Sequence, residues 1–425
     1  MRFFYILAVY LAAPLVSLVM LARGFRDRSY WGRFAERFGF GARLEGGGIW
    51  IHAVSVGEVQ AAAALVTTLR ERYPVIPVVV TTFTPTGAAR ANALFKDLVQ
   101  VRYIPFDLPG SVRRFFDRVQ PRLAVIFETE LWPNVYHACG QRRIPLVLAS
   151  ARISNRSVSR YRKLGSLFRD ALARGVVVAA QAEGDADRFR ALGADPERTH
   201  VTGNIKFDFS VPLDIVERGN RLREFYAEAR PVWVAGSTHA GEEEIVLEAH
   251  EIVRAVHPRA LLVLVPRHPP RFDEVAHRLQ SAGVRFVRRS RRAGEKAGAT
   301  SALADVLLVD TLGELLDFYA AGDVAFVGGS LVPIGGHNLL EPAALGVPIL
   351  TGPHTTNSAE IAALLVSRGA AEVVNDANEL GSAVTALLSD PEERERIGAL
   401  GRDCVDTNRG AIAKLLGLIE PLLRG

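Results

Sequence analysis

The stretch VGGSLVPIGGHNLLEPAALGVPILTGPHTTN, residues 327–357, decides the fold of the second half of the chain. Its pattern predicts a buried strand at residues 324–327, a glycine-rich loop at 328–336 and a helix at 338–345 whose first turn faces the loop. Strand, loop and helix in this order are typical of an α/β sheet. Because the bare backbone amides at a helix N-terminus attract anions, the loop is a candidate anion-binding site.

Groups that suit a nucleotide gather in this loop. Glycines let the main chain approach a ligand, which a Cβ would prevent. His337 and Asn338 offer donors, and Glu341 lies one turn on, where its carboxylate can accept from a diol. The pattern predicts binding of a phosphate and a ribose, and an ordinary strand-to-helix turn is the alternative. The glycines concerned are Gly328, Gly329, Gly335 and Gly336.

The composition indicates two domains in a reducing compartment. A chain of 425 residues with 49% apolar content is too large for one ordinary core, which predicts two α/β domains. Only Cys139 and Cys404 are present, which argues against a disulfide framework. The formal charge is +5, but residues 1–45 hold seven Arg against three acidic residues. The basicity is therefore mostly local and does not indicate a nucleic-acid-binding surface.

The N-terminus predicts a membrane anchor. Residues 3–22 carry no charge and are long enough to cross a hydrocarbon core as a helix that Pro14 can kink. A cleaved signal peptide is the alternative, although no small-x-small site precedes Arg23. The arginines and aromatic residues of residues 23–38 favour a cytoplasmic location for the rest of the chain and an interfacial helix on anionic lipid. A solvated connector is the alternative for this last segment.

Short apolar runs then alternate with helical stretches, which predicts two doubly wound parallel sheets. A hinge is expected at residues 210–214, before a charged helix at 215–230. Ligands of such sheets bind at the carboxyl ends of the strands. The first series of expected strands is 49–53, 75–81, 99–103, 123–127, 146–149 and 176–180, and the second is 232–235, 261–265, 285–287, 306–309, 324–327 and 348–350.

Polar groups follow the first two strands of the second series. Arg267 stands between prolines after the second strand, well placed to pair with a phosphate in a bidentate fork. A structural salt bridge is the alternative for Arg267, and His268 beside it has a structural alternative too. The first strand is followed by Gly236, Ser237, Thr238 and His239, and then by an acidic helix start at residues 241–244.

Carboxylates follow two strands of the first series. Glu58 comes shortly after the first strand, on a glycine turn with Ser55 and Gly57, where it could take a proton. Complementing the helix dipole is the alternative. Glu128 and Glu130 follow the strand at residues 123–127, which brings further acids to the same edge. Clustered acids raise one another's pKa, as a base that works at neutral pH requires.

A basic segment could bind an anionic acceptor. Arg152 and Arg156 open a run of basic residues, and Asn204 and Lys206 further on can join them. A solvated basic helix is the alternative. Asp185 and Asp187 lie in a charged helical stretch and do not predict a metal site, and the chain has neither a His-x-x-x-His pair, a Cys cluster nor a G-x-x-x-x-G-K-[ST] loop.

The runs HAVSVGE, TTFTPTG, FETELWPN, ARISNRS, TGNIKFD, GSTHAGEE and LVPRHPPRF precede the stretch at 327–357. In this order, over nearly the whole chain, they resemble those of the bacterial 3-deoxy-D-manno-octulosonic acid (Kdo) transferases of lipopolysaccharide assembly. The resemblance implies a GT-B glycosyltransferase with two Rossmann-like domains facing a central cleft and an N-terminal anchor helix. The expected parts are the anchor at 1–22, an acceptor-binding domain at 23–211 and a CMP-Kdo-binding domain at 212–425, whose last helix is expected to return to the first domain.

The resemblance also implies roles for single residues. Glu58 would be the general base for the acceptor hydroxyl, and Glu128 its supporting carboxylate. Arg267 would hold the CMP phosphate together with loop amides near Gly335 and Gly336. Asn338 and Glu341 would contact ribose and base. The family pattern often has Pro after GGHN, where this chain has Leu339 and Leu340. Further donor-binding residues would be Gly236, Ser237, Thr238, His268 and His337, and acceptor-binding residues Ser55, Gly57, Arg152, Arg156 and Lys206.

The expected reaction is an inverting transfer of Kdo from CMP-Kdo to a lipid A precursor of the lipid IVA type. We expect it at the cytoplasmic face of the inner membrane, without metal or other cofactor, nucleic acid or obligate protein partner. A transferase that uses a UDP-hexosamine and a non-catalytic membrane-anchored binder of lipid or nucleotide are the alternatives. A comparison of turnover with CMP-Kdo and with UDP-sugars tests the first alternative. Loss of activity in Glu58→Ala excludes the second.

Overall fold

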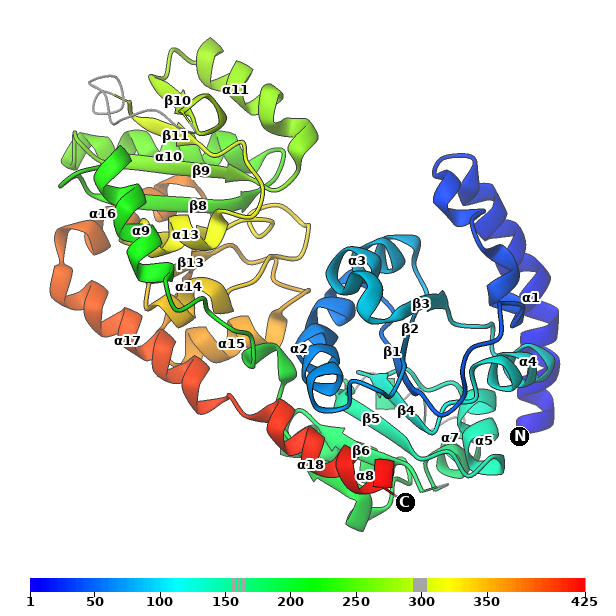
Figure 1. Cartoon of the computed structure of the whole chain (residues 1–425). Coiled ribbons are helices and arrows are strands. Elements are labelled where there is room, and N and C mark those ends of the chain that lie inside the picture. Colours follow the sequence, from blue (N-terminus) through cyan, green and yellow to red (C-terminus); the bar gives the residue numbers. More distant parts are fainter. Residues whose placement is uncertain (155–156, 159–160, 162–164, 174, 293–303, 425) are drawn as a thin grey trace. The chain divides into compact units, whose positions relative to one another are not determined.

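A computed structural model describes residues 1–154, 157–158, 161, 165–173, 175–292 and 304–424. The chain divides into two compact units, and each is described by itself (Figure 1). Unit 1 comprises Met1–Phe209 and Asn408–Gly425, and unit 2 comprises Ser210–Thr407. The division falls next to the hinge expected at residues 210–214.

Unit 1 is built on a parallel sheet with the strand order β3-β2-β1-β4-β5-β6-β7. Residues from both faces of this sheet are buried under helices, in two apolar clusters that include Trp50 and Ile51 on β1. The strands are β1 Ile49–His52, β2 Val78–Thr82, β3 Gln100–Tyr103, β4 Leu123–Phe127, β5 Leu146–Ala151, β6 Val177–Ala180 and β7 Thr199–Val201. The helices are α1 Arg2–Gly24, α2 Val56–Arg72, α3 Pro85–Phe95, α4 Pro109–Val119, α5 Pro133–Gln141, α7 Gly165–Leu172, α8 Glu183–Ala191 and α18 Ala411–Arg424.

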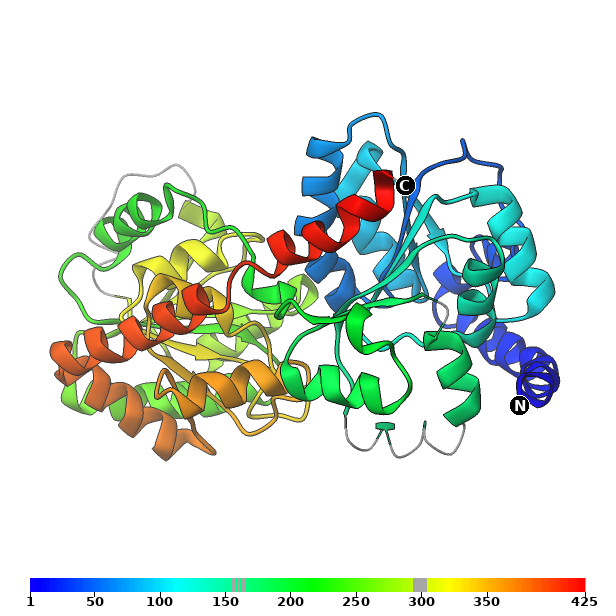
Figure 2. The ribbon, with the colours of Figure 1, turned by 90° about the horizontal axis from the view of Figure 1, so that it is seen from below.

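Unit 2 repeats this architecture with the strand order β10-β11-β9-β8-β12-β13-β14, again parallel (Figures 1 and 2). Trp233 on β8 is fully buried in its core. The strands are β8 Val232–Thr238, β9 Leu261–Pro266, β10 Phe286–Arg288, β11 Val306–Leu308, β12 Val324–Val327, β13 Ile349–Thr351 and β14 Ala371–Val373. The helices are α9 Ile215–Tyr226, α10 Glu242–Val256, α11 Phe272–Ser281, α13 Leu315–Ala321, α14 Leu340–Leu345, α15 Ala359–Ser367, α16 Ala377–Ser389 and α17 Pro391–Thr407.

The two doubly wound sheets confirm the predicted fold class. The edge strands β7 and β14 were not predicted, because each has three residues of which two are exposed, so neither forms an apolar run. The helix expected at residues 338–345 begins only at Leu340. Asn338 precedes it, and its side-chain oxygen accepts from the Leu340 amide at 3.1 Å. Asn is favoured before a helix because its side chain satisfies such an amide.

The last helix, α18, belongs to unit 1. Leu415, Leu416 and Ile419 are buried in the same apolar cluster as β1 and α2. The Asp208 carboxylate accepts from the Gly410 amide at 2.6 Å and from the amide of Ile412. The segment 408–424 is therefore held in unit 1 by apolar packing and by a charged acceptor at the start of α18.

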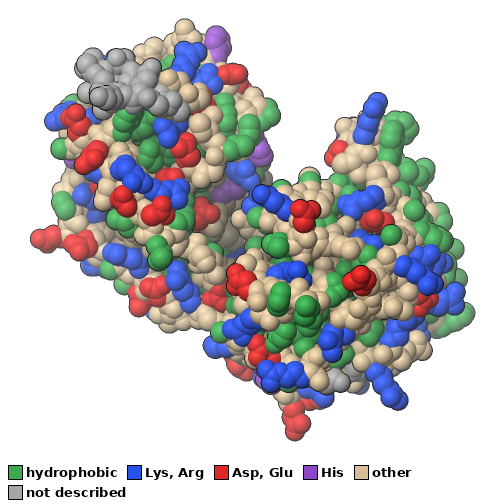
Figure 3. Space-filling view, viewed as in Figure 1, with side chains coloured by type: hydrophobic (Ala, Val, Ile, Leu, Met, Phe, Trp, Pro, Cys, Tyr) green, Lys and Arg blue, Asp and Glu red, His purple; other side chains and the backbone are tan. Residues whose placement is uncertain are grey.

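The first helix is also part of unit 1, and is not the separate segment 1–22 that we expected. The Tyr5 hydroxyl donates to the Asp107 carboxylate at 2.8 Å, and Met20 is buried against Phe106 and Leu108. Partly buried residues recur along α1 at helical spacing, which places one stripe of the helix against the unit. The opposite side exposes large apolar residues, which Figure 3 shows along this helix: Phe3, Phe4, Leu7, Leu11, Leu15 and Leu18.

Candidate active site

The strand orders place the candidate residues of each unit at a topological switch point. In unit 1 the order reverses at β1 and β4, where the carboxyl ends lead to Glu58 and Glu128. In unit 2 it reverses at β8 and β12, which lead to Thr238 and to the loop that starts at Gly328. Open α/β sheets bind ligands at such points.

Glu58 lies in the first turn of α2, directly after β1. Its Oε2 accepts from the Val54 amide at 2.8 Å and its Oε1 from the Ser55 hydroxyl at 3.4 Å. Burial raises the pKa of Glu58 to about 7, against the lowering effect of the Val54 amide, and the charges of Glu128 and Glu130 raise it further. A carboxylate with this pKa can accept a proton near neutral pH.

This site differs from the expectation in two respects. Burial of the Glu58 carboxyl, not the clustering of acids, is the largest cause of its raised pKa. Gly57 is not a turn residue but the second residue of α2, and a Cβ there would meet no atom closer than the Ser55 hydroxyl oxygen at 4.0 Å. Gly57 is therefore an exposed and uncrowded position of the helix.

Glu128, unlike Glu58, forms ion pairs with basic side chains. Its carboxylate lies 3.5 Å from the Arg152 guanidinium and 3.5 Å from the Lys206 ammonium. Its φ of +54° is in the left-handed region, which costs a non-glycine residue energy and is common at functional sites. Burial raises the pKa of Glu130, which the hydrogen bond from the Trp132 indole at 2.7 Å opposes.

Two of the predicted acceptor-binding residues, Arg152 and Lys206, thus meet at Glu128. Lys206 follows Asn204, whose side chain accepts from the Lys206 amide at 3.0 Å and fixes the short turn that carries it. Arg156 lies outside the described residues, as do most of the other members of the basic run.

The glycine-rich loop of unit 2 is closed on itself. The amides of Gly335 and Gly336 both donate to the Gly329 carbonyl, at 3.1 and 2.7 Å. These two amides are therefore not available to a phosphate, which corrects the expectation. In the described part of the loop, the amides of His337 and Asn338 donate no hydrogen bond.

The loop glycines are needed for their backbone conformation and for close packing. Gly335 and Gly336 have φ of +109° and +74°, in the region that favours glycine. A Cβ on Gly335 would lie 2.6 Å from the side-chain amide nitrogen of Asn357. On β8, a Cβ on Gly236 would lie 2.1 Å from the Tyr319 hydroxyl. The close approach predicted at Gly335 is thus made to another part of unit 2, as is the approach at Gly236.

Glu341 and Asn338 form a polar pair beside this loop. The Asn338 side-chain amide donates to Glu341 at 3.0 Å. Burial raises the pKa of Glu341, while the charge of Arg267 lowers it. The guanidinium of Arg267 is exposed and forms no ion pair with any described carboxylate, so the structural salt bridge considered for it is absent from the described residues.

Three histidines lie next to Arg267. The Nε2 atoms of His239 and His337 are 2.8 Å apart, and the ring of His268 meets that of His239 edge to face with centroids 5.1 Å apart. Burial lowers the pKa of His337 to about 4, and the neighbouring His239 lowers it further. Burial also lowers the pKa of His239. The pair is therefore uncharged near neutral pH, with one ring donating and the other accepting.

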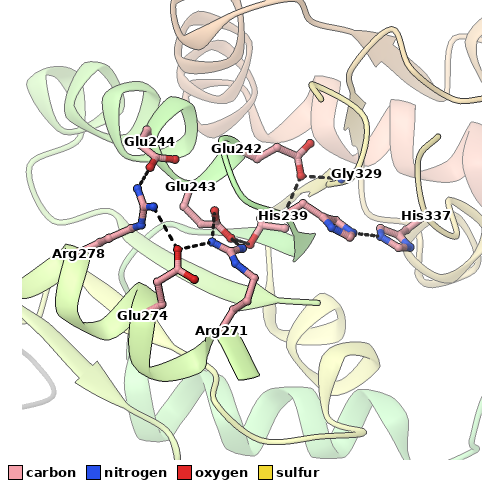
Figure 4. Close-up of polar contacts among 10 residues, drawn as sticks. His239, Glu242, Glu243, Glu244, Arg271, Glu274, Arg278, Gly329 and His337 are labelled. Carbon is pink, nitrogen blue, oxygen red and sulfur yellow. Dashed lines mark hydrogen bonds and ion pairs between the residues drawn. The ribbon is translucent and has the colours of Figure 1, made fainter. Parts of the chain in front are cut away.

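Sequence reasoning missed the roles of two carboxylates at the start of α10, which Figure 4 shows. Glu242, fully buried, accepts from backbone amides of residues 239 and 329–331. Glu243 accepts from the Thr238 hydroxyl at 3.1 Å and from the Arg271 guanidinium at 2.6 and 3.2 Å. The run of three acids after a strand end was visible in the sequence, but their partners come from other elements.

A third missed carboxylate, Asp107, lies in unit 1. It accepts from the amides of Asn134 and Val135 at 3.0 and 2.9 Å, besides the Tyr5 hydroxyl. Burial raises the pKa of Asp107 to about 6, against the lowering effect of these donors. Asp107 connects α1 to the start of α5, and no motif in the sequence marks it.

Comparison with known proteins identifies the family. Residues 32–209 match the family model described as 3-deoxy-D-manno-octulosonic-acid transferase (kdotransferase). The chain is 43% identical over 426 residues to the 3-deoxy-D-manno-octulosonic acid transferase of Haemophilus influenzae, covering 99% of both chains. This chain belongs to the Kdo transferase family. It is accordingly a glycosyltransferase, as the sequence motifs indicated.

Solved structures are similar as well. The C-terminal CMP-Kdo binding domain of a protein from Acinetobacter baumannii is 35% identical, covers 46% of this chain and 99% of its own, and has a TM-score of 0.42. The UDP-GlcNAc 2-epimerase of Neisseria meningitidis is 15% identical, with a TM-score of 0.58, over 88% of this chain and 99% of its own. The second likeness shows the shared fold, the two-domain GT-B type.

Proposed function

We propose that this Kdo transferase moves Kdo from CMP-Kdo to a lipid A precursor of the lipid IVA type, with inversion at the anomeric carbon. The observation that carries the proposal is the state of Glu58. Its carboxyl is largely buried with a pKa raised to about 7, and it forms no ion pair with any described cation. Such a group is suited to take the proton of an acceptor hydroxyl.

The reaction follows from that assignment. Glu58 accepts the proton while the acceptor oxygen attacks the anomeric carbon of Kdo, and the bond from that carbon to the CMP phosphate oxygen breaks. The leaving phosphate gains negative charge as CMP departs. A single displacement of this kind inverts the configuration of the anomeric carbon.

The leaving phosphate would be stabilised by unit 2. Arg267 offers an exposed guanidinium without a carboxylate partner among the described residues, and the amides of His337 and Asn338 are unused. Charge-assisted hydrogen bonds from such donors stabilise developing negative charge. Asn338 and Glu341 are proposed to contact ribose and base, and the other donor contacts are proposed for Gly236, Ser237, Thr238 and His268. This mechanism assigns no step to a metal or other cofactor.

The acceptor would be bound in unit 1, next to Glu58. Ser55 and Gly57 border the carboxyl, and Arg152 and Lys206 bring positive charge to Glu128. Both ion pairs are 3.5 Å long, so an anionic acceptor could draw the cations away from Glu128 at modest cost. Glu128 is thus proposed to hold these cations ready and to sustain the raised pKa of Glu58.

We propose that α1 lies in the cytoplasmic face of the inner membrane with its apolar side in lipid. The helix is long and apolar enough to cross a membrane, with a mean hydropathy of 2.3. Its contacts with unit 1, however, run from Tyr5 to Met20, nearly its full length. Asp107 accepts from Tyr5 and the Asn134 side chain accepts from Arg2, at 3.3 Å. A crossing orientation would draw these polar partners into hydrocarbon, which is costly. Trp31, whose indole donates to the Leu21 carbonyl at 2.9 Å, and the arginines that follow suit the interface.

Purified full-length protein in anionic vesicles tests the function. We expect CMP-Kdo and a lipid A precursor to give a product whose mass rises by one or more Kdo residues, with no turnover of UDP-sugars under the same conditions. Glu58→Gln should lose the activity while still binding CMP. Turnover of a UDP-hexosamine in place of CMP-Kdo would refute the donor assignment. Full activity of Glu58→Gln would refute the assignment of Glu58 as the base. Neither a nucleic acid nor a protein partner should be needed.

A further inference from the structure

Glu242 occupies an unusual environment for a carboxylate at the start of a helix. It is the first residue of α10, and its side chain is completely buried. Oε2 accepts from the amides of His239 and Gly329 at 3.0 and 2.7 Å. Oε1 accepts from the amides of Ser330 and Leu331, both at 2.9 Å. Four donors from two segments thus share one carboxylate, with two on each oxygen (Figure 4 shows the contacts to His239 and Gly329).

The two segments follow neighbouring strands. His239 follows β8, and residues 329–331 follow β12, with Gly236 paired in register to Val327. Glu242 therefore joins the two strand ends at the switch point of unit 2, where the glycine-rich loop begins. Backbone amides aimed inward at a buried anion are strongly held, since charge-assisted hydrogen bonds are about twice as strong as neutral ones.

The turn at residues 329–331 lies against one ring of the histidine pair. Gly329 has a φ of +70°, and a Cβ built on it would lie 2.9 Å from Cδ2 of His337. The carbonyl of the same Gly329 accepts the amides of Gly335 and Gly336. Through Gly329, the contacts of Glu242 fix where the loop returns to His337 and Asn338.

Only a carboxylate satisfies all four amides. A Gln side chain of the same size has one acceptor oxygen, and its NH₂ group would face two backbone N–H donors. Two amides of the turn would then be buried without an acceptor, and the turn would move to find other partners.

We infer that Glu242 is a positioning residue for the donor, whose carboxylate sets the glycine-rich turn so that the loop can bind the nucleotide phosphate. The inference rests on the proposed function, because it assigns the loop to CMP-Kdo. Glu242 itself is buried and does not touch the substrate. Its removal should therefore weaken the binding of CMP and CMP-Kdo without removing the catalytic base.

The test compares Glu242→Gln with Asp323→Asn in the full-length protein, with CMP as the probe. Asp323 is a matched control, because it also accepts a backbone amide, that of Val232 at 2.8 Å, at the opposite end of β8. Both variants lose a carboxylate in unit 2 and should lower the melting temperature. Only Glu242→Gln is expected to raise the Kd of CMP and the KM for CMP-Kdo, by about tenfold or more, with the KM for the acceptor unchanged.

An increase in the Kd of CMP below about twofold in folded Glu242→Gln, or an equal increase in Asp323→Asn, would overturn the inference. If Glu242→Gln does not fold, Gly329→Ala supplies the test, because it disturbs the same turn and leaves Glu242 in place. We expect Gly329→Ala to weaken CMP binding similarly, and unchanged binding would refute the role of the turn. A wild-type protein that binds no CMP and transfers no Kdo would instead refute the proposed function.

Discussion

Glu58 in unit 1 and Glu242 in unit 2 occupy corresponding places and differ in use. Each follows a glycine in the first turn of the helix after a switch-point strand, α2 after β1 and α10 after β8. Each carboxylate reaches back to a backbone amide just before its helix, that of Val54 or His239. Glu58 accepts one amide and is a partly exposed residue, whereas Glu242 accepts four amides and is fully buried. The same local arrangement therefore carries the proposed base in one unit and a carboxylate that holds backbone amides in the other.

The comparison shows what decides the role of such a carboxylate. A neighbouring loop supplies three amides to Glu242 and uses up its acceptor capacity. Without that loop, Glu58 is desolvated with few donors, and its pKa rises to about 7. Burial with few hydrogen bonds raises the pKa of a carboxyl toward that of a base at neutral pH, whereas backbone donors on both oxygens let a carboxylate hold the main chain in place.

The largest effect is expected for Glu58→Gln, which tests the proposed difference between Glu58 and Glu242. Gln keeps the size and an acceptor for the Val54 amide but cannot take the proton, so turnover should fall by about a hundredfold to ten-thousandfold. CMP binding and the melting temperature should stay close to those of the wild type, in contrast to Glu242→Gln. The exposed Glu71→Gln on the same helix is the control and should keep full turnover. Turnover above about a tenth of wild type in Glu58→Gln would move the base to another group, with Glu128 the first candidate.

Arg267→Ala tests the donor side of unit 2. Loss of a charge-assisted phosphate contact should weaken donor use by about 1.5 to 3 kcal/mol and leave the KM for the acceptor nearly unchanged. Arg267→Lys should recover only part of the lost donor use, because an ammonium lacks the planar fork of a guanidinium. Arg278→Ala, which removes an exposed arginine of α11, serves as the control. Steady-state kinetics with each substrate varied in turn give the answer, and an equal loss for donor and acceptor would contradict the assignment.

The pH dependence of the rate sharpens the difference between the two carboxylates. Glu58 acts as a base only when ionised, and its pKa is raised to about 7. As the pH falls below 7 the ionised fraction drops, so kcat/KM should decrease about tenfold per pH unit, while above 7 it should level off. The residual activity of Glu58→Gln should not show this step. A wild-type profile that stays flat from pH 5.5 to 8 would exclude Glu58 as the titrating group.

Much of this arrangement could be predicted from the sequence, and the limits have a physical cause. The apolar runs predicted most of the buried strands, and the motif around Glu58 singled out a carboxyl whose pKa is raised by burial. The identical Gly-Glu pair at Gly241 and Glu242 could not be assigned a role, because three of the four amides that Glu242 accepts lie 87 to 89 residues away. Likewise, the resemblance implied that amides near Gly335 and Gly336 hold the phosphate, but the turn of the backbone directs both of these amides to the Gly329 carbonyl. Local patterns identify elements, whereas the use of each polar group depends on contacts between elements.

The smallest effect is expected at Asp107, which holds α1 to the start of α5. Its carboxylate accepts from two backbone amides and from the Tyr5 hydroxyl. If α1 is part of the folded unit, Tyr5→Phe should lower the free energy of unfolding by about 1 to 3 kcal/mol, since a hydrogen bond to a charged group is lost while the ring stays in place. Tyr10→Phe, on the exposed side of α1, should change it by less than about 0.5 kcal/mol. Denaturant unfolding in detergent and in lipid measures both variants. Equal stability of the two would show that α1 leaves the unit, and then a protein starting near Gly24 should fold as well as the full chain. If Tyr5→Phe is destabilising in lipid too, α1 stays packed on unit 1 when the protein is bound to a membrane. Only the apolar side of the helix is then left to contact the bilayer.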